Sequence, residues 1–361
     1  MKMTKMTALL LAAAMALTAC GSTAAASSTA ASEAASVEAT AAPEATAAPE
    51  EPAAETAVTY PLTVTDQLGR EVTIEEEPKT LASGYYISTS ALIALGVQDR
   101  IVGIEAKAAK RPIYSLSAPE LIALPNVGSA KEFNLEGCIA LKPDLVILPK
   151  KLKDAAATLG ELGIPVLLVN PESQENLEDM IALLGEATGT EERAAELLGY
   201  IDDLCDYLEE KLADTRKPRV YLAGNSNLLT TAGGKMYQSG MVTLAGAENV
   251  AAEIEDTYWA EVSYEQLLKW NPDVIVLASD ASYSVEDVLA DENLADCTAV
   301  KNGAVYQLPG DAEAWDSPVP SGILGSVWLA SVLHGDVMGE ECEDIIHDFY
   351  QRFYGFSYGE N

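Results

Sequence analysis

Histidine is almost missing from this 361-residue chain, which contains only His334 and His347. Both fall in C-terminal segments with helical spacing, where we expect a surface or core role. The chain also lacks the GxSxG and HExxH motifs of hydrolases, and it shows no serine, histidine and aspartate constellation. We therefore predict that the protein is not an enzyme, and a secreted hydrolase is the alternative from another class.

Cysteines are few and scattered. Beyond Cys20 the chain holds only Cys138, Cys205, Cys297 and Cys342, and none of them forms a CxxC pair. Neither a disulfide framework nor a cysteine metal site is indicated. We interpret these four residues as mostly buried thiols, with a disulfide between two of them as the alternative, and we predict no metal site made by the protein alone.

Basic residues are also scarce. The 22 lysines and arginines stand against 56 acidic residues, which gives a formal net charge of −34. A surface that binds nucleic acid needs clustered positive charge, so this balance argues against a nucleic-acid partner. It also argues against a protein that lies flat on anionic lipid. Acidity of this kind keeps a secreted protein soluble.

The N-terminus carries an export signal. Two lysines precede an apolar stretch at residues 7–19, which is typical of a signal peptide and too short to span a bilayer. Residues 17–21 (LTACG) resemble a bacterial lipobox, in which the cysteine is lipidated and the chain is cleaved before it. We predict a signal peptide at residues 1–19 and a lipid on Cys20 that anchors the protein to the outer face of the cell membrane.

A low-complexity segment occupies residues 20–58. It consists almost entirely of Ala, Ser, Thr, Pro and Glu, and it repeats the unit EATAAP at residues 38–49. Because it has so few large apolar side chains, it cannot bury a core, and we predict a disordered linker. Its prolines and like charges favour an extended spacer between the lipid and a folded region.

Two later segments, residues 134–148 and 263–277, repeat each other. In each, a glutamate (Glu136 or Glu265) stands seven positions before a Pro-Asp pair, and a continuous apolar run follows. This pattern predicts a short helix that ends at the proline, followed by a strand buried on both faces of a parallel sheet. Two such segments with matching spacing predict two lobes of like construction.

Strands and helices alternate through the rest of the chain, so we predict an α/β fold with a mostly parallel sheet, flanked by helices, in each lobe. We place the N-terminal lobe at residues 59–172, a connecting helical segment at 173–216 and the C-terminal lobe at 217–361. Residues 191–212 run without proline and are predicted to form one long rigid helix between the lobes. The expected strands are 80–83, 101–104, 145–148, 166–169, 219–223, 274–277 and 305–308, and the expected shorter helices are 90–95, 155–162, 240–245 and 286–289.

Several of these features together resemble a known family. The lipobox, residues 64–72 (VTDQLGREV) and residues 92–103 (LIALGVQDRIVG) are similar to the substrate-binding lipoproteins of bacterial ABC importers, in the branch that serves iron-siderophores, haem and cobalamin. The resemblance covers nearly all of residues 60–361. It implies the periplasmic-binding-protein fold, in which one rigid helix joins two α/β lobes and the ligand lies in the cleft between them. It also implies a monomer that works with an ABC permease and its ATPase.

The resemblance implies no intrinsic cofactor. It implies a transported ligand, namely an iron chelate, haem or a corrinoid, with a small oxyanion or a nickel chelate as the alternative. It further implies that Glu136 and Glu265 dock onto arginines of the permease, one from each lobe. Glutamate is also favoured near a helix start by the helix dipole, which is the purely structural explanation of both positions.

Ligand contacts are expected from loops at the strand ends that face the other lobe. The candidates in the N-terminal lobe are Tyr85, Tyr86, Lys107, Lys110, Arg111, Tyr114, Lys131 and Phe133. The candidates in the C-terminal lobe are Met236, Tyr237, Tyr258, Trp259 and Trp315. Aromatic side chains could stack on a planar ligand, and a tyrosine or Met236 could hold a haem iron.

A basic group in the first of these loops stands out in so acidic a chain. If Lys107, Lys110 and Arg111 face the cleft, they favour a ligand of net negative charge, and a solvated loop is the alternative. No histidine lies in a predicted cleft loop, so a bare zinc ion is not expected as the ligand.

Overall fold

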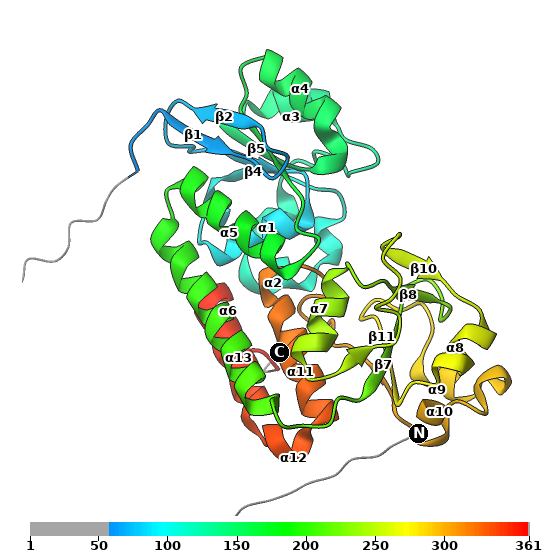
Figure 1. The fold of residues 1–361 in the computed structure, drawn as a ribbon. Coiled ribbons are helices and arrows are strands. Elements are labelled where there is room, and N and C mark those ends of the chain that lie inside the picture. Colours follow the sequence, from blue (N-terminus) through cyan, green and yellow to red (C-terminus); the bar gives the residue numbers. More distant parts are fainter. Residues whose placement is uncertain (1–57, 360–361) are drawn as a thin grey trace, which may run out of the picture. The chain divides into compact units, whose positions relative to one another are not determined.

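The computed structural model describes residues 58–359, which lie in one compact unit that begins at Thr56. The predicted signal peptide, Cys20 and nearly all of the predicted linker lie outside the described residues. Figure 1 shows two sheets with their helices, one formed by the first half of the described chain and one by the second half.

The first sheet has four parallel strands in the order β4-β3-β5-β6. Its strands and the two-stranded antiparallel hairpin that precedes them are β1 (Leu62–Thr65), β2 (Glu71–Ile74), β3 (Leu81–Ser83), β4 (Ile101–Ile104), β5 (Leu145–Pro149) and β6 (Val166–Val169). Every residue of β5 and β6 is buried, as expected for a parallel strand covered on both faces. Its helices are α1 (Tyr86–Ala94), α2 (Pro112–Ser117), α3 (Leu135–Leu141), α4 (Lys153–Glu161) and α5 (Gln174–Thr188).

The second sheet follows the order β10-β8-β7-β11-β12, with β9 paired to β7. Its strands are β7 (Arg219–Ala223), β8 (Thr230–Ala232), β9 (Glu248–Asn249), β10 (Trp259–Glu261), β11 (Val274–Leu277) and β12 (Val305–Gln307). The pairs of β7 with β9, β7 with β11, and β11 with β12 are parallel. The pairs of β7 with β8 and of β8 with β10 are antiparallel. Its helices are α7 (Tyr237–Leu244), α8 (Tyr264–Trp270), α9 (Val285–Leu289) and α10 (Thr298–Lys301). The predicted fold class, with a mostly parallel sheet in each lobe, is confirmed.

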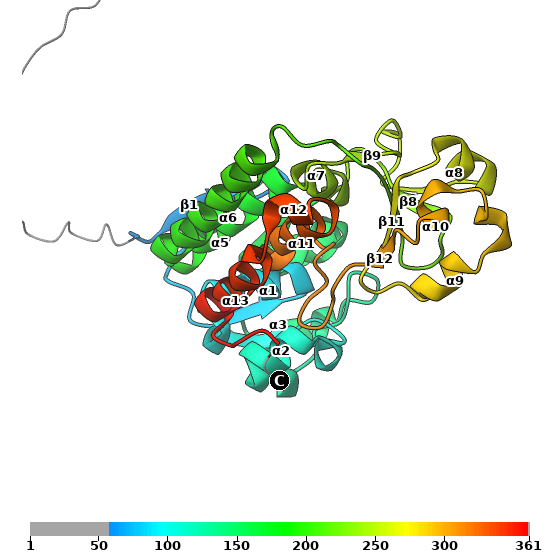
Figure 2. The ribbon, with the colours of Figure 1, turned by 90° about the horizontal axis from the view of Figure 1, so that it is seen from below.

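One long helix, α6 (Glu191–Leu212), leads from the first lobe to the second, with the bounds that the sequence predicts. Its buried residues recur at intervals of three or four, from Ala194 to Leu212, so one face of the helix packs on the core. The C-terminal helices α11 (Ile323–Leu333), α12 (Gly335–Met338) and α13 (Glu341–Tyr354) return toward it. Both views show α13 beside α6 (Figures 1 and 2), and Tyr200 of α6 packs edge-on against Phe353 of α13.

The two repeated segments form matching helix–strand units. Helices α3 and α8 each have seven residues, and each is capped by a polar side chain, Asn134 or Ser263, that accepts a hydrogen bond from the first turn. Each ends in a residue with a left-handed backbone, Lys142 (φ 51°) or Asn271 (φ 46°). The Pro-Asp pair then directly precedes an interior strand of each sheet, β5 or β11.

The aspartates of these Pro-Asp pairs fasten each unit to the neighbouring strand. Asp144 accepts hydrogen bonds from the backbone N–H of Thr80 (2.8 Å) and from that residue's hydroxyl (2.9 Å). Asp273 accepts one from the backbone N–H of Arg219 (2.9 Å). The same side chain therefore performs the same task in both lobes, which supports the repeat found in the sequence.

Candidate functional site

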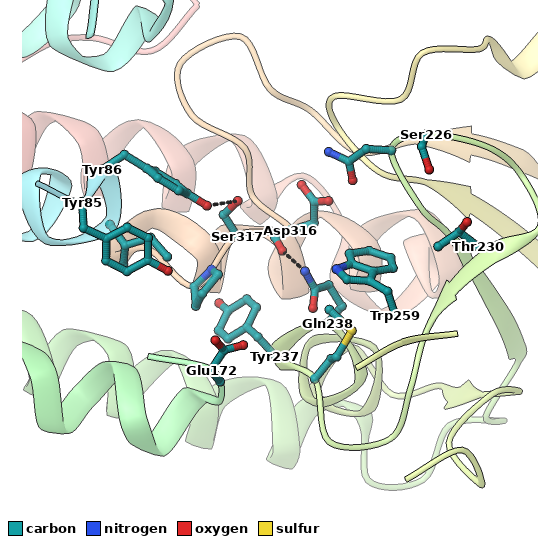
Figure 3. Close-up of a pocket in the computed structure, with 14 residues that line it drawn as sticks. Tyr85, Tyr86, Glu172, Ser226, Thr230, Tyr237, Gln238, Trp259, Asp316 and Ser317 are labelled. Carbon is teal, nitrogen blue, oxygen red and sulfur yellow. Dashed lines mark hydrogen bonds between the residues drawn. The ribbon is translucent and has the colours of Figure 1, made fainter. Parts of the chain in front are cut away.

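A cavity of about 490 Å³ has walls from both lobes. Its lining is mixed, with four aromatic rings, several hydroxyl and amide groups and two carboxylates. The lining residues are Tyr85, Tyr86, Ile87, Glu172, Asn225, Ser226, Thr230, Met236, Tyr237, Gln238, Trp259, Asp316, Ser317 and Pro318. This volume lies within the usual range for small-molecule sites, so the cavity is the candidate ligand site (Figure 3).

The start of one helix from each lobe forms part of the wall. Tyr85 precedes α1 and Met236 precedes α7, and neither residue caps its helix through a side-chain hydrogen bond. The first N–H groups of a helix have no partner within it. The cavity is therefore lined by backbone donors as well as by side chains.

The charged groups in the wall are acidic. Among the described residues that line the cavity, Glu172 and Asp316 carry charge and none is a lysine or arginine. The Nζ atom of Lys150 lies 3.5 Å from the Glu172 carboxylate and offsets it. Burial raises the pKa of Asp316, while a 2.5 Å hydrogen bond from the hydroxyl of Ser279 opposes that shift. The cavity therefore lacks the cationic side chains that the sequence suggests.

Two hydrogen bonds tie the wall together across the site. The Tyr86 hydroxyl donates to the hydroxyl of Ser317 (3.4 Å), and the Gln238 side-chain N–H donates to the carbonyl of Asp316 (2.6 Å). Figure 3 shows both contacts as dashed lines. The segment before α11 thus links the starts of α1 and α7, which fixes the back of the cavity.

Five of the thirteen ligand-contact residues expected from the sequence line this cavity. They are Tyr85, Tyr86, Met236, Tyr237 and Trp259. The rule that ligands lie at strand ends therefore predicts five residues that line this cavity, and their contact with a ligand stays a prediction. The same rule could have found Asn225 and Ser226, which directly follow β7, whereas no sequence signal singles out Gln238 or Ser317.

The expected basic group does not line the cavity. Lys107 and Lys110 are exposed, and Lys110 lines a separate cavity beside Phe356. The guanidinium carbon of Arg111 lies 3.9 Å from the centre of the Tyr86 ring, and its Nε lies 3.3 Å from the carboxylate of Glu105. Burial raises the pKa of Glu105, which hydrogen bonds and this guanidinium partly offset. Arg111 therefore backs the wall rather than facing the cavity.

Two expected aromatic contacts are enclosed in the core. Tyr114 is fully buried, and its hydroxyl donates to Glu105 (2.8 Å). Trp315 is 1% exposed, and its indole N–H donates to the hydroxyl of Tyr350 (2.8 Å). Both are committed to internal hydrogen bonds and have almost no surface left for a ligand.

The remaining three expected contacts lie outside the cavity lining. Lys131 is exposed, and Phe133 is half-buried against the side chain of Leu148 and its neighbours. Tyr258 is 44% exposed, with its ring centre 5.7 Å from the Nζ of Lys150, which follows β5 of the first lobe. The Tyr258 ring and the lysine thus approach each other from opposite lobes.

The two glutamates expected to dock onto a permease occupy equivalent positions. Glu136 is the second residue of α3 and Glu265 is the second residue of α8, and both side chains are exposed. Neither has an ion-pair partner among residues 58–359. Both carboxylates are therefore accessible to a partner from solution.

Within the described part of the chain, no group of three or more His, Cys, Asp or Glu residues could hold a metal ion. The four cysteines there, Cys138, Cys205, Cys297 and Cys342, are unpaired, and all but Cys205 are buried. Between residues 58 and 359, no helix combines the length and apolarity of a membrane span.

Comparison with known proteins places this architecture in a family. The periplasmic binding protein family model matches residues 81–312. The molybdate-binding protein MolA of Haemophilus influenzae is 29% identical over 82% of this chain and 91% of its own length. Its molybdate-bound crystal structure superposes with a TM-score of 0.72, at 28% identity, over 82% of this chain and 99% of that one.

Two further relatives match over most of the chain. The ABC transporter substrate-binding lipoprotein YvrC of Bacillus subtilis is 28% identical over 72% of this chain and 82% of its own length. A cobalamin-binding protein of Halobacterium salinarum is 26% identical over 70% of this chain and 68% of its own length. These relatives are named as binding proteins rather than enzymes. The chain belongs to the periplasmic binding protein family.

Proposed function

We propose that this chain is the extracytoplasmic substrate-binding protein of an ABC importer, which captures a ligand between its lobes and delivers it to a permease. The observation that carries the proposal is a cavity with walls from both lobes, lined by the starts of α1 and α7. The name of the relative YvrC, an ABC transporter substrate-binding lipoprotein, supports the same role and a lipid anchor at Cys20.

A compact oxyanion is the ligand that we favour. The relative MolA binds molybdate, and the cavity of about 490 Å³ suits a small ligand. A corrinoid is the second candidate, because a further relative is a cobalamin-binding protein and four aromatic rings line the cavity. The cavity offers no cationic side chain to an iron chelate of high negative charge, so we favour that ligand least.

Delivery would use the paired glutamates. Glu136 and Glu265 stand at equivalent positions of the repeated units, one in each lobe, and both are exposed. Exposed carboxylates at matched sites can pair with arginines of a partner by charge-assisted hydrogen bonds. Two such contacts would align the protein on a permease.

Ligand capture is tested by thermal unfolding of the full chain with sodium molybdate, cyanocobalamin, haemin or a ferric hydroxamate. A probe at 100 times its Kd adds about 2.7 kcal/mol to the free energy of unfolding, which raises the unfolding temperature measurably. We expect molybdate or cyanocobalamin to do so. The same temperature with every probe would argue against the proposed function.

Delivery is tested with the double charge reversal Glu136→Lys and Glu265→Lys. A matched control reverses Glu175 and Glu286, which are exposed second residues of α5 and α9 and bear the same relation to their helix dipoles. We expect the first pair alone to abolish uptake into vesicles that contain the importer, while ligand affinity stays unchanged. Normal uptake by the first pair would refute the docking role.

A further inference from the structure

Two helices from opposite lobes begin at the cavity wall. Helix α1 has nine residues and helix α7 has eight, and the cavity is lined by the residue before each helix and by its first two residues. Among residues 58–359, no acceptor pairs with the backbone N–H of Tyr86 or Tyr237, the first residue of each helix. The start of a helix carries about half a positive charge. Two such ends at one cavity attract an anion without help from a lysine or arginine.

Two tyrosine hydroxyls add a second feature of the same kind. Tyr237 is 5% exposed, and no hydrogen bond to its hydroxyl exists among the described residues. The hydroxyl of Tyr85, from the other lobe, also lacks a partner there. Figure 3 shows both hydroxyl groups directed into the space between the two rings. A buried hydroxyl without a partner normally finds one in a ligand or in water.

The two carboxylates in the wall do not cancel this attraction for an anion, because each has a partner. Glu172 is offset by Lys150 at 3.5 Å, and Asp316 accepts a 2.5 Å hydrogen bond from the hydroxyl of Ser279. Both carboxylates have partners outside the cavity, whereas the helix ends and the two hydroxyls have none among residues 58–359. These unpaired groups are uncharged: the helix ends and the two hydroxyls can donate to an anion, whereas the Oε1 atom of Gln238, also without a partner among the described residues, is an acceptor.

We infer that the cavity binds a tetrahedral oxyanion through the backbone N–H groups that begin α1 and α7 and through the hydroxyls of Tyr85 and Tyr237, with no cationic side chain. The inference rests on the proposed function, because it names the ligand class and the contacts of that same site. Each lobe supplies one helix end and one hydroxyl, so one bound oxyanion contacts both lobes.

A series of substitutions at Tyr237 separates these contributions. Tyr237→Phe removes only the hydroxyl, Tyr237→Ala removes the ring, and Tyr237→Pro removes the ring and the backbone N–H together. Proline suits the first position of a helix, and the extended backbone of Met236 (φ −82°, ψ 151°) can precede it. The comparison of the proline and alanine variants therefore isolates the backbone N–H.

Binding is measured by isothermal titration of the full chain with sodium molybdate, sodium sulfate and inorganic phosphate, and with cyanocobalamin as the non-oxyanion probe. We expect at least one oxyanion to bind. Loss of the hydroxyl should weaken that binding about tenfold, and the proline variant should bind about tenfold more weakly than the alanine variant, as for hydrogen bonds to a charged group. The pair Tyr86→Ala and Tyr86→Pro repeats the comparison on α1.

A measurement without substitution guards against variants that fold poorly. In the full chain labelled with ¹⁵N-tyrosine, which contains 15 tyrosines, the bound oxyanion should shift the amide signals of Tyr86 and Tyr237 most strongly. Binding of cyanocobalamin alone would overturn the inference and leave the receptor function standing. Oxyanion binding that is equal in the proline and alanine variants, with unshifted amides, would also overturn it. Failure of all four probes would overturn it too, and the receptor function would then rest on the thermal test with haemin and a ferric hydroxamate.

Discussion

Arg111 lies behind Tyr86, with its guanidinium carbon 3.9 Å from the centre of the ring. The cation that the sequence suggests for the cleft is therefore used to hold an aromatic wall residue in place. Its Nε has no hydrogen-bond partner of good geometry among the described residues and lies 3.3 Å from the buried carboxylate of Glu105. The guanidinium of Arg111 thus contacts both Tyr86 in the cavity wall and the buried carboxylate of Glu105.

Replacing Arg111 should therefore affect both stability and ligand binding. Arg111→Ala leaves Glu105 without its nearby cation and Tyr86 without its support, so we expect the free energy of unfolding to fall by about 1–3 kcal/mol. Arg111→Lys should recover little of the lost stability, because an ammonium group lacks the flat face that stacks on the ring of Tyr86. Urea unfolding measures the effect. The exposed Lys110→Ala is the control and should change stability by less than about 0.5 kcal/mol; equal stability of the Arg111 and Lys110 variants would contradict this account.

Glu313 should make stability depend on pH. It is 8% exposed, it accepts hydrogen bonds from the hydroxyls of Ser90 (3.0 Å) and Ser321 (2.6 Å), and burial raises its pKa to about 7. An unfolded glutamate has a pKa of about 4.3. Between about pH 4.3 and about pH 7 the folded chain therefore keeps a proton that the unfolded chain has released. The free energy of unfolding falls over this range as the pH rises, and the loss is complete once the pH has passed about 7.

The variant Glu313→Gln isolates this effect, since it keeps the shape but cannot ionise. We expect wild type and variant to unfold at similar urea concentrations at pH 4, whereas above pH 7 the variant should be more stable by about 3 kcal/mol. Other buried acids, such as Glu105 and Asp316, are present in both proteins and cancel in the comparison. Parallel stability curves from pH 4 to pH 8 would show that Glu313 does not titrate in this way.

Gly224 lies against the indole ring of Trp259 in the cavity wall. A Cβ atom at this position would lie 3.0 Å from the ring of Trp259 and 3.2 Å from the carbonyl of Thr230. Gly224→Ala should push the ring a few tenths of an ångström, change the tryptophan fluorescence and weaken molybdate binding two- to fivefold, which corresponds to about 0.5–1 kcal/mol.

Gly199→Ala is the matched control for that substitution. Gly199 lies within α6, and a Cβ atom there meets nothing within 4 Å. Alanine is the better helix former, so this variant should gain about 0.5–1 kcal/mol of stability without any change in ligand affinity. Unaltered fluorescence and affinity in Gly224→Ala would remove Gly224 from the account of the site.

The two Pro-Asp pairs should contribute independently to stability. Asp144→Ala removes the acceptor for the Thr80 N–H, and Asp273→Ala removes the acceptor for the Arg219 N–H. Each change should cost about 1 kcal/mol. Because the two sites lie in different lobes, the double variant should lose the sum of the single losses within about 0.5 kcal/mol. Strong non-additivity in urea unfolding would mean that the lobes are coupled at these strands.

The backbone plan could be predicted from the sequence because its signals are local. Continuous apolar runs define β5, β6, β7 and β11 almost to the residue, and the uninterrupted pattern of α6 gives its bounds. The sequence predicts a helix from residue 90, whereas α1 begins at Tyr86, because this helix is buried nearly all round and shows no clear periodicity. The sequence pattern does not predict the hairpin of β1 and β2.

The orientation of the site residues could not be predicted in this way. Trp315 follows the same loop rule as Trp259, yet its partner Tyr350 arrives from α13, far along the chain. Arg111 lies over the ring of Tyr86, which belongs to another element, α1. Long-range packing decides which side chain of a strand-end loop faces the cavity, and the sequence pattern does not encode it.

The central claim is that one ligand occupies the cavity and touches both lobes. Its most direct test is isothermal titration of the full chain with sodium molybdate or cyanocobalamin, whichever raises the unfolding temperature. Tyr85→Ala in the first lobe and Tyr237→Ala in the second are compared with the exposed control Lys110→Ala. The account predicts one site per chain, with affinity reduced about tenfold or more by either tyrosine change and unaltered by the control. Unchanged affinity in both tyrosine variants would contradict it.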